Sequence, residues 1–288
     1  MITLENDYLK VKLVAKGAEL QSLFSKETDV EYLWNGDAKY WGKHSPVLFP
    51  IVGALKDDTY SYKDKDYHLP RHGFARDQVF SIERQNDTEV VLSLSQSEES
   101  LKIYPFYFNL KLKYQITERK LMVTYEVSNT GTDELLFSLG AHPAFAVPNT
   151  ANTTYQDYYL AFNHDDKLSC WKLDGGLVAN ETNIIELDGH KLNLKHSLFD
   201  NDALVFKTLQ SNCISLLNRK NEFGLHFHFE DFPFFGIWAA PNAPFVCLEP
   251  WCGVADGVNH KQQFENKEGI NKLAPGKIFT RFWEAECF

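Results

Sequence analysis

The sequence lacks a long apolar segment, a surplus of basic residues and an even set of cysteines. No stretch is apolar over the roughly 20 residues that a membrane span needs. The opening MITLENDYLKVKL alternates instead of forming the apolar run of a secretion signal. A net charge of −10 disfavours nucleic acid and anionic membranes, because both bind a basic face. Five cysteines, an odd number, argue against a disulfide framework and for a reducing cytoplasm. We therefore expect a cytoplasmic protein without nucleic-acid or membrane partners, and no feature indicates an oligomeric state.

Long helical periodicity is also nearly absent, and period-two alternation takes its place. Alternating segments that predict half-buried strands are residues 9–14, 79–84, 89–96, 108–116, 121–129 and 225–230. Asp188-Gly189 between two apolar runs predicts a two-residue hairpin, and residues 59–69 predict another. Residues 98–106 and 195–199 have the pattern of single helical turns. Without repeats or linkers, the whole chain is predicted to be one all-β domain of packed antiparallel sheets.

Motifs for common cofactors are missing as well. No segment matches a phosphate-binding loop, a dinucleotide fingerprint or a Gly-x-Ser-x-Gly elbow. His226 and His228 share a strand face, but no third metal ligand lies nearby in the sequence. The spacing of Cys247 and Cys252 fits neither a zinc ribbon nor a thioredoxin motif, so free, buried or partly buried thiols are expected. The sequence therefore predicts no metal and no other cofactor.

What is present are three segments that place reactive side chains beside glycine or proline. The first is RHGFARDQVF, which begins at Arg71. In a regular strand Arg71 and His72 point to opposite faces, so convergence needs a kink, which Gly73 permits. We expect His72 and Arg76 to face a pocket and Arg71 to lie on the surface. The alternative for Arg76 is a surface ion pair with Asp77.

The second segment is FSLGAHPAFAVP. His142 lies at the end of a strand-like run, and Pro143 biases it towards extended geometry. A histidine held there among small apolar neighbours is well placed to deliver a proton. A hydrogen-bonded core histidine is the alternative.

The third segment is FVCLEPWCGVADG. Glu249 ends a run of four apolar residues, and a carboxylate at the end of a buried strand is rarely placed there for solubility. Trp251 shares its face and is a candidate aromatic platform for a sugar. A structural ion pair is the alternative for Glu249.

Taken in order, SPVLFPIVG, HGFAR, YPFYF, LGAHPAF and CLEPWCG resemble the galactose mutarotase-like (aldose 1-epimerase) family, and within it the LacX-like branch. The resemblance covers essentially the whole chain. It implies a large antiparallel β-sandwich, the galactose mutarotase-like supersandwich, with a site on its concave face. It also implies cofactor-independent interconversion of sugar anomers, with a small aldose as the partner.

The resemblance also implies residue roles. His72 would contact the sugar, His142 would be the general acid at the ring oxygen, and Glu249 the base at the anomeric hydroxyl. The family holds sugar hydroxyls with an aspartate at the start of a strand, for which FDNDALVF offers Asp202, with Asp200 as the rival register. Asp202 is preferred because it directly enters the apolar run. The predicted catalytic residues are Glu249, His142 and His72, and the predicted substrate-binding residues are Arg76, Asp202 and Trp251.

One departure from the family pattern leaves the sugar open. Galactose mutarotases carry an arginine upstream of the first histidine, where this sequence has Ala54 and Lys56 in VGALKDD. The leading hypothesis is an aldose 1-epimerase for free hexoses such as galactose or glucose. The alternatives are a hexose 6-phosphate mutarotase, a non-catalytic carbohydrate-binding protein of this fold, and a glycoside hydrolase, which needs two carboxylates. From reference pKa values near ~4.3 and ~6.5, the acid limb of a pH profile should report Glu249 and the alkaline limb a histidine.

Overall fold

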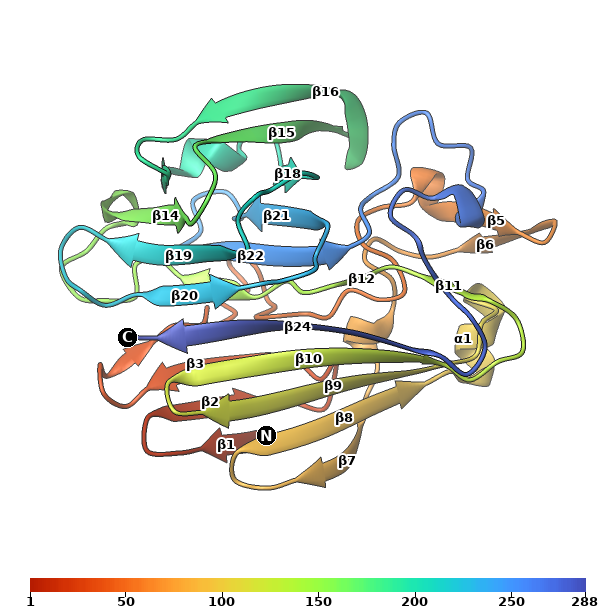
Figure 1. Ribbon diagram of the computed structural model, residues 1–288, viewed down its shortest axis with the longest axis horizontal. Helices are drawn as coiled ribbons and strands as arrows, with labels where there is room; N and C mark the ends of the chain where they lie inside the picture. The colour runs from red at the N-terminus through yellow and green to blue at the C-terminus, as the bar shows by residue number, and fades with distance from the viewer.

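Antiparallel strands form most of the regular secondary structure (Figure 1). The computed structural model describes residues 1–288. The largest sheet has nine strands, in the order β17 (Lys191–Asn193), β14 (Tyr158–Phe162), β19 (Cys213–Asn218), β20 (Leu225–His228), β24 (Ile278–Cys287), β10 (Lys120–Asn129), β9 (Phe108–Thr117), β8 (Glu89–Ser95) and β7 (Ser81–Gln85).

A second sheet carries Glu249 and Trp251 on one of its strands. Its order is β12 (Leu139–Gly140), β22 (Phe245–Cys252), β21 (Phe234–Trp238), β18 (Leu204–Phe206), β15 (Lys167–Asp174) and β16 (Leu177–Glu186), with β13 (Ala144–Ala146) also paired to β22.

Smaller sheets and short helices complete the chain. A four-stranded sheet contains β1 (Ile2–Glu5), β2 (Leu9–Leu13), β3 (Leu20–Ser25) and β4 (Val30–Glu31). The two-stranded sheets are β5 (Thr59–Tyr62) with β6 (Lys65–His68), and β11 (Leu135–Phe137) with β23 (Asn271–Leu273). The helical pieces are α1 (Glu98–Ile103) and the 3₁₀ turns η1 (Lys56–Asp58), η2 (Ala75–Asp77), η3 (Tyr155–Asp157), η4 (His196–Phe199) and η5 (Phe264–Asn266). None of these helices has the length and apolar character of a membrane span.

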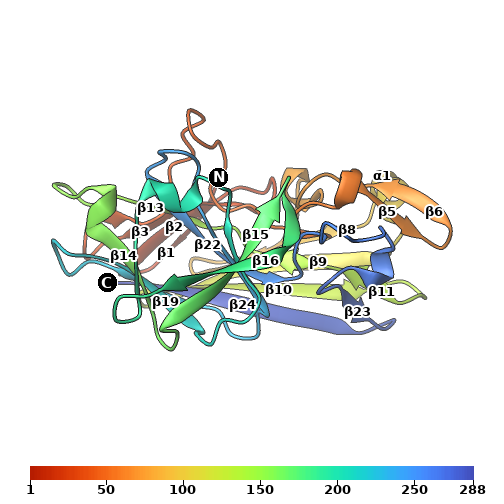
Figure 2. The ribbon, with the colours of Figure 1, turned by 90° about the horizontal axis from the view of Figure 1, so that it is seen from above.

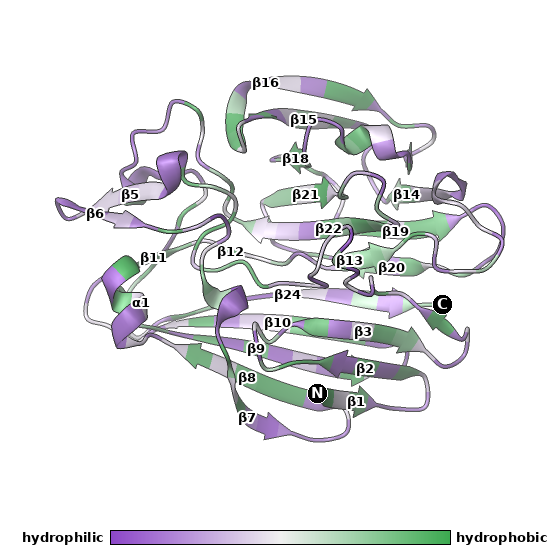
Figure 3. Cartoon of the chain, turned by 180° about the vertical axis from the view of Figure 1, so that it is seen from behind, coloured by the Kyte–Doolittle hydropathy of each residue, from purple (hydrophilic) through white to green (hydrophobic).

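The sheets pack face to face around an aromatic-rich core (Figure 2). Burial alternates residue by residue along β9 and β10, and Figure 3 shows the matching bands of hydrophobic and hydrophilic residues on the long strands. Phe227 of the nine-stranded sheet contacts Phe145 and Phe235 of the second sheet, with ring centres 5.6 and 6.5 Å apart. One cluster of 72 buried residues results, which explains why the alternating segments form strands. The predicted β-sandwich is thus confirmed, whereas its description as one domain stays a prediction.

Most local predictions hold. All six alternating segments contain a strand, the hairpin at residues 59–69 is β5–β6, and the two helical turns are α1 and η4. The β5–β6 turn places Lys63 and Asp64 at positive φ, as a tight two-residue turn requires. Ser97 caps α1 by accepting a hydrogen bond from the Ser100 N–H.

The predicted hairpin at Asp188-Gly189 is wrong. The chain does reverse there, since the backbone groups of Asp188 and Lys191 bond reciprocally at 3.1 and 3.2 Å. The flanking strands then separate, because β16 pairs with β15 in the second sheet and β17 pairs with β14 in the first. The turn residues determined the reversal, but the pairing partners of each strand lie elsewhere in the chain.

A buried ion pair holds the loop that follows β22. The side chains of Asp256 and Lys267 are fully buried, with Lys267 Nζ 2.8 Å from Asp256 Oδ1. The other carboxylate oxygen, Oδ2, accepts a hydrogen bond from the Lys56 N–H at 2.9 Å and lies 3.2 Å from His260 Nδ1. One carboxylate therefore ties the loop after β22 to Lys267, 11 residues further on, and to Lys56, 200 residues away.

Replacing Lys267 by methionine should leave the Asp256 carboxylate buried without its cation. Removal of one partner of a buried pair costs about 3–5 kcal/mol of the free energy of unfolding. Urea denaturation of Lys267→Met should show this loss. Lys272→Met, on the exposed side of β23, is the control and should change stability by less than roughly 0.5 kcal/mol. Equal midpoints for the two variants would mean that the buried pair does not hold the loop.

Candidate active site

A cavity of about 270 Å³ opens against the second sheet. Its walls come from β22, from the segment before η2, from the β15–β16 turn and from the loops that precede β13 and β18. Every residue predicted for the site lies in these walls: His72, Arg76, His142, Asp202, Glu249 and Trp251. The structure therefore brings together side chains spread over about 180 positions of sequence, although their roles stay predictions.

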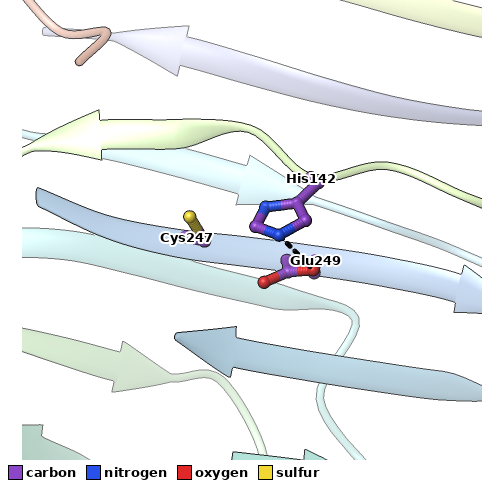
Figure 4. A group of neighbouring side chains, drawn as sticks. All are labelled: His142, Cys247 and Glu249. Atoms are coloured by element: carbon purple, nitrogen blue, oxygen red, sulfur yellow. Dashed lines mark ion pairs between the residues drawn. The ribbon is translucent and has the colours of Figure 1, made fainter. Parts of the chain in front are cut away.

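The centre of the cavity wall is a buried carboxyl–imidazole pair. Glu249 is 2% exposed and His142 is 7% exposed, and His142 Nε2 lies 3.4 Å from Glu249 Oε2 (Figure 4). Glu249 belongs to β22, all eight residues of which are buried. The backbone on either side of His142 bonds to β22, through Ala141 N–H to Pro250 O and Leu248 N–H to Pro143 O. These bonds fix the register that sets the imidazole beside the carboxyl.

Burial opposes charge on both members of this pair. It raises the pKa of the Glu249 carboxyl well above its usual range, and it lowers the pKa of His142 to about 3. Both shifts favour the uncharged form of each group, so burial favours a pair without net charge. The order of the two pKa values is therefore the reverse of the order of the reference values, in which a glutamate titrates below a histidine. Reference values do not include the cost of burying a charge.

Two tryptophans that the sequence did not single out surround His142. Trp41 stacks on the imidazole with ring centres 4.9 Å apart, and Trp238 meets it edge-on at 5.7 Å. Trp238 ends a strand, but Trp41 lies in a long irregular segment without any motif, so no local signal marked it. The predicted platform, Trp251, also lines the cavity, and it lies over Gly236, where a Cβ would come within 2.3 Å of its ring.

His72 enters the cavity from a sharply bent backbone. His72 and Gly73 both have positive φ, at 68° and 71°, and a Cβ on Gly73 would lie 2.3 Å from the carbonyl oxygen of Phe49. The Gly53 N–H donates to His72 Nδ1 at 3.1 Å, so the neutral ring carries its proton on Nε2. Burial, aided by His142, holds the pKa of His72 well below its usual range. His72 is thus a neutral hydrogen-bond donor at the site.

The expectation that Arg71 lies on the surface is wrong in one respect. Its side chain is 46% exposed, but it lines the cavity, and its Nη1 is 4.0 Å from Asp202 Oδ2. The kink begins at His72 itself, so neighbouring residues no longer alternate between faces. Arg76 lines the cavity as predicted, donates to Arg71 O at 2.9 Å, and also lies 3.8 Å from Asp77, as in the alternative.

Of the two rival aspartates, only Asp202 lines the cavity. Asp202 lies two residues before the start of β18 and has a φ of 85°. Its Oδ1 accepts a hydrogen bond from the Ala203 N–H at 2.8 Å. Asp200 instead follows η4 as its C-terminal cap. The sequence-based preference for Asp202 over Asp200 therefore agrees with which of the two lines the cavity.

His226 and His228 lie away from this cavity, on β20. Glu284 and Glu286 of β24 lie opposite the two histidines, and ligand atoms of His228, Glu284 and Glu286 lie within 4.8 Å of one another, but His226 is not part of this group. Lys120 Nζ is 2.9 Å from Glu284, so one of the two carboxylates is already paired with a lysine. Both Cys247 and Cys252 are buried free thiols, as expected.

Comparison with known proteins gives consistent similarities. A family model of aldose 1-epimerases matches residues 1–279. The chromosomal LacX protein of Lactococcus lactis subsp. lactis is 34% identical over 284 residues, which cover 95% of each chain. The structure of a galactose mutarotase related enzyme from Lactobacillus acidophilus superimposes with a TM-score of 0.95 at 34% identity, covering 100% of this chain and 97% of that one. A galactose mutarotase-like protein from Lactobacillus casei gives a TM-score of 0.91 at 31% identity, covering 100% of both.

Proposed function

The chain belongs to the aldose 1-epimerase family, and we propose that it interconverts the α and β anomers of a free hexose such as galactose or glucose. The observation that carries this proposal is the Glu249–His142 pair, 3.4 Å apart and buried in a cavity of about 270 Å³. Such a cavity lies just below the range of roughly 300–1,000 Å³ that is usual for ligand sites, which favours a monosaccharide.

The reaction needs one group that removes a proton and one that supplies a proton. Glu249 takes the proton of the anomeric hydroxyl while His142 protonates the ring oxygen, so the ring opens to the aldehyde. Rotation about the C1–C2 bond and closure on the other face yield the second anomer. Each positioned group contributes roughly 10²–10⁴ in rate, or about 2.7–5.5 kcal/mol of the barrier. Two groups are sufficient, because mutarotation already proceeds in water.

The buried pair suits this task because ring opening and ring closure both use the one exchangeable proton that Glu249 and His142 share. As the hydroxyl of the sugar approaches Glu249, it favours the ionised carboxylate, and the proton passes to the adjacent His142 Nε2. No net charge has to enter or leave the apolar site during this transfer. His72 Nε2–H and the Asp202 carboxylate supply a donor and an acceptor for the remaining sugar hydroxyls.

A second substrate, a hexose 6-phosphate, is favoured by one observation. Two arginines line the cavity, Arg71 and Arg76, whereas the sequence analysis expected one. A phosphate commonly recruits more than one cation, and charge-assisted bonds are roughly twice as strong as neutral ones. The Asp202 carboxylate, 4.0 Å from Arg71, reduces this positive charge, and the neutral hexose remains the leading proposal.

The Glu249→Gln variant should fold normally and lose at least about 10² in mutarotation rate, because an amide cannot accept the proton. Polarimetry with galactose and glucose measures the rate. Glu268→Gln is the control, since Glu268 pairs only with Lys207 outside the cavity and should keep wild-type turnover.

Thermal melting at several pH values separates loss of chemistry from loss of fold. Burial raises the pKa of Glu249, so ionisation destabilises the wild-type fold as pH rises through that value. Glu249→Gln lacks this ionisation and should be at least as stable as the wild type at alkaline pH. A folded variant that keeps near-normal turnover would contradict the assignment of the base, and so favour a binding protein or another catalytic group.

The pH dependence of kcat/KM should show a plateau wider than the interval between the reference values of ~4.3 and ~6.5. On the acid side His142 gains a proton at low pH, because burial lowers its pKa to about 3, and the pair then holds two protons. On the alkaline side Glu249 ionises late, because burial raises its pKa, and the pair then holds none. A narrow bell with both limbs inside the reference interval would contradict this order.

The choice between free and phosphorylated hexose rests on the two arginines. Measurements of kcat/KM for galactose, glucose and glucose 6-phosphate are compared among the wild type, Arg71→Ala and Arg76→Ala. For a neutral substrate, Arg76→Ala should raise KM modestly and the wild type should not prefer the phosphate. If the wild-type kcat/KM for glucose 6-phosphate exceeds that for the free sugars by more than about tenfold, and either variant loses this preference, the proposed substrate is wrong and a hexose 6-phosphate takes its place. The proposed acid–base chemistry would not change.

A further inference from the structure

The acid–base pair has a third neighbour that the proposed reaction does not use. Cys247 precedes Glu249 by two residues on β22, so both side chains project from the same face of the strand towards His142 (Figure 4). One ligand atom from each of these three residues lies within 4.8 Å of the other two, and all three residues are buried. A thiol, an imidazole and a carboxyl therefore converge at one point.

The separations are close to those of a zinc centre. Nitrogen and oxygen ligands lie about 2.0–2.2 Å from zinc, so in a tetrahedral site they are about 3.4 Å apart. The observed distance from His142 Nε2 to Glu249 Oε2 is 3.4 Å. A thiolate about 2.3 Å from the same ion would be roughly 3.6 Å from the other ligands. The Cys247 thiol lies within 4.8 Å of both other ligand atoms, which is at most about 1.2 Å beyond that separation.

The types of ligand atom, and the side from which they can be reached, indicate which ion would bind. Sulfur and imidazole ligands favour zinc and copper over magnesium, which prefers oxygen ligands. His142 and Glu249 line the cavity whereas Cys247 lies behind them, so an ion enters from the cavity side. Three protein ligands leave the fourth position of a tetrahedral ion open towards the cavity.

The surroundings are those of a reversible site. In resident zinc centres the second ring nitrogen of a histidine ligand is held by an outer partner. His142 Nδ1 is buried and has no hydrogen-bond partner.

We propose that His142, Cys247 and Glu249 form a reversible inhibitory site for Zn²⁺. The bound ion occupies the lone pairs with which His142 and Glu249 exchange protons, and it fills the position that the sugar oxygens need. Inhibition is therefore competitive with the sugar. The inhibition rests on the proposed function, whereas the binding of the ion does not.

The first test uses mutarotation by protein treated with a chelator. The chelator-treated wild type should be active, micromolar Zn²⁺ should inhibit it, Mg²⁺ should not, and excess chelator should restore activity. Cys247→Ala should keep its rate without zinc and need at least about tenfold more Zn²⁺ for the same inhibition. Cys252→Ala is the matched control, because Cys252 lies on the same strand, is equally buried and is absent from the cluster.

Equal zinc sensitivity of the wild type and Cys247→Ala would overturn the site. So would activity that a chelator abolishes and zinc restores, because the ion would then be a cofactor and not an inhibitor. If Cys247→Ala folds poorly, Cys247→Ser provides a second variant that lacks the thiolate.

The second test needs no activity. Co²⁺ added to the wild type should produce a thiolate-to-cobalt charge-transfer band, which Cys252→Ala keeps and Cys247→Ala loses. Absence of the band from the wild type overturns the site. If the band appears but the protein mutarotates none of the sugars, the metal site is supported and the proposed function is not. Failure of the metal site and failure of the proposed function therefore give different results.

Discussion

Burial of a carboxyl and an imidazole side by side is the constraint on which the rest of the site depends. A single buried charge is costly, but two buried groups that share one proton remain neutral as a pair. The sandwich provides the burial, because β22 lies inside the second sheet and all of its residues are covered. The same burial raises the pKa of Glu249 and lowers that of His142, so the uncharged form of each group is favoured.

The other walls of the cavity are held by contacts that have no counterpart in local sequence. Asp256 ties the segment after β22 to Lys56 and Lys267, which places the apolar floor of the cavity. Phe49 O accepts the N–H groups of Phe74 and Ala75, which stabilises the bend that presents His72. These contacts hold the cavity walls beside Glu249 and His142. The wall at Arg71 is more exposed, because that side chain is 46% exposed.

Sequence reasoning selected residues that line the cavity where a residue's chemistry conflicts with its surroundings. A glutamate within an apolar strand, a histidine before a proline and an aspartate entering an apolar run are each unusual locally, and Glu249, His142 and Asp202 all line the cavity. It failed where the neighbours are ordinary. Trp41 occupies a loop without a motif, Arg71 resembles a solvated charge, and Cys247 resembles any core thiol, yet all three lie at or beside the site.

The sequence by itself determined the strands, because alternation has the period of a pleated strand and turn residues interrupt it. It also offered the candidate site residues and, through its ordered motifs, indicated the family that the comparisons show. The tertiary structure alone decided which strands pair, as the separation of β16 from β17 after a correct turn shows. It also decided the protonation of the site and the approach of Cys247 to His142. The pairing of strands, the desolvation of side chains and their proximity depend on groups that are remote in the chain. No local sequence pattern therefore predicts them.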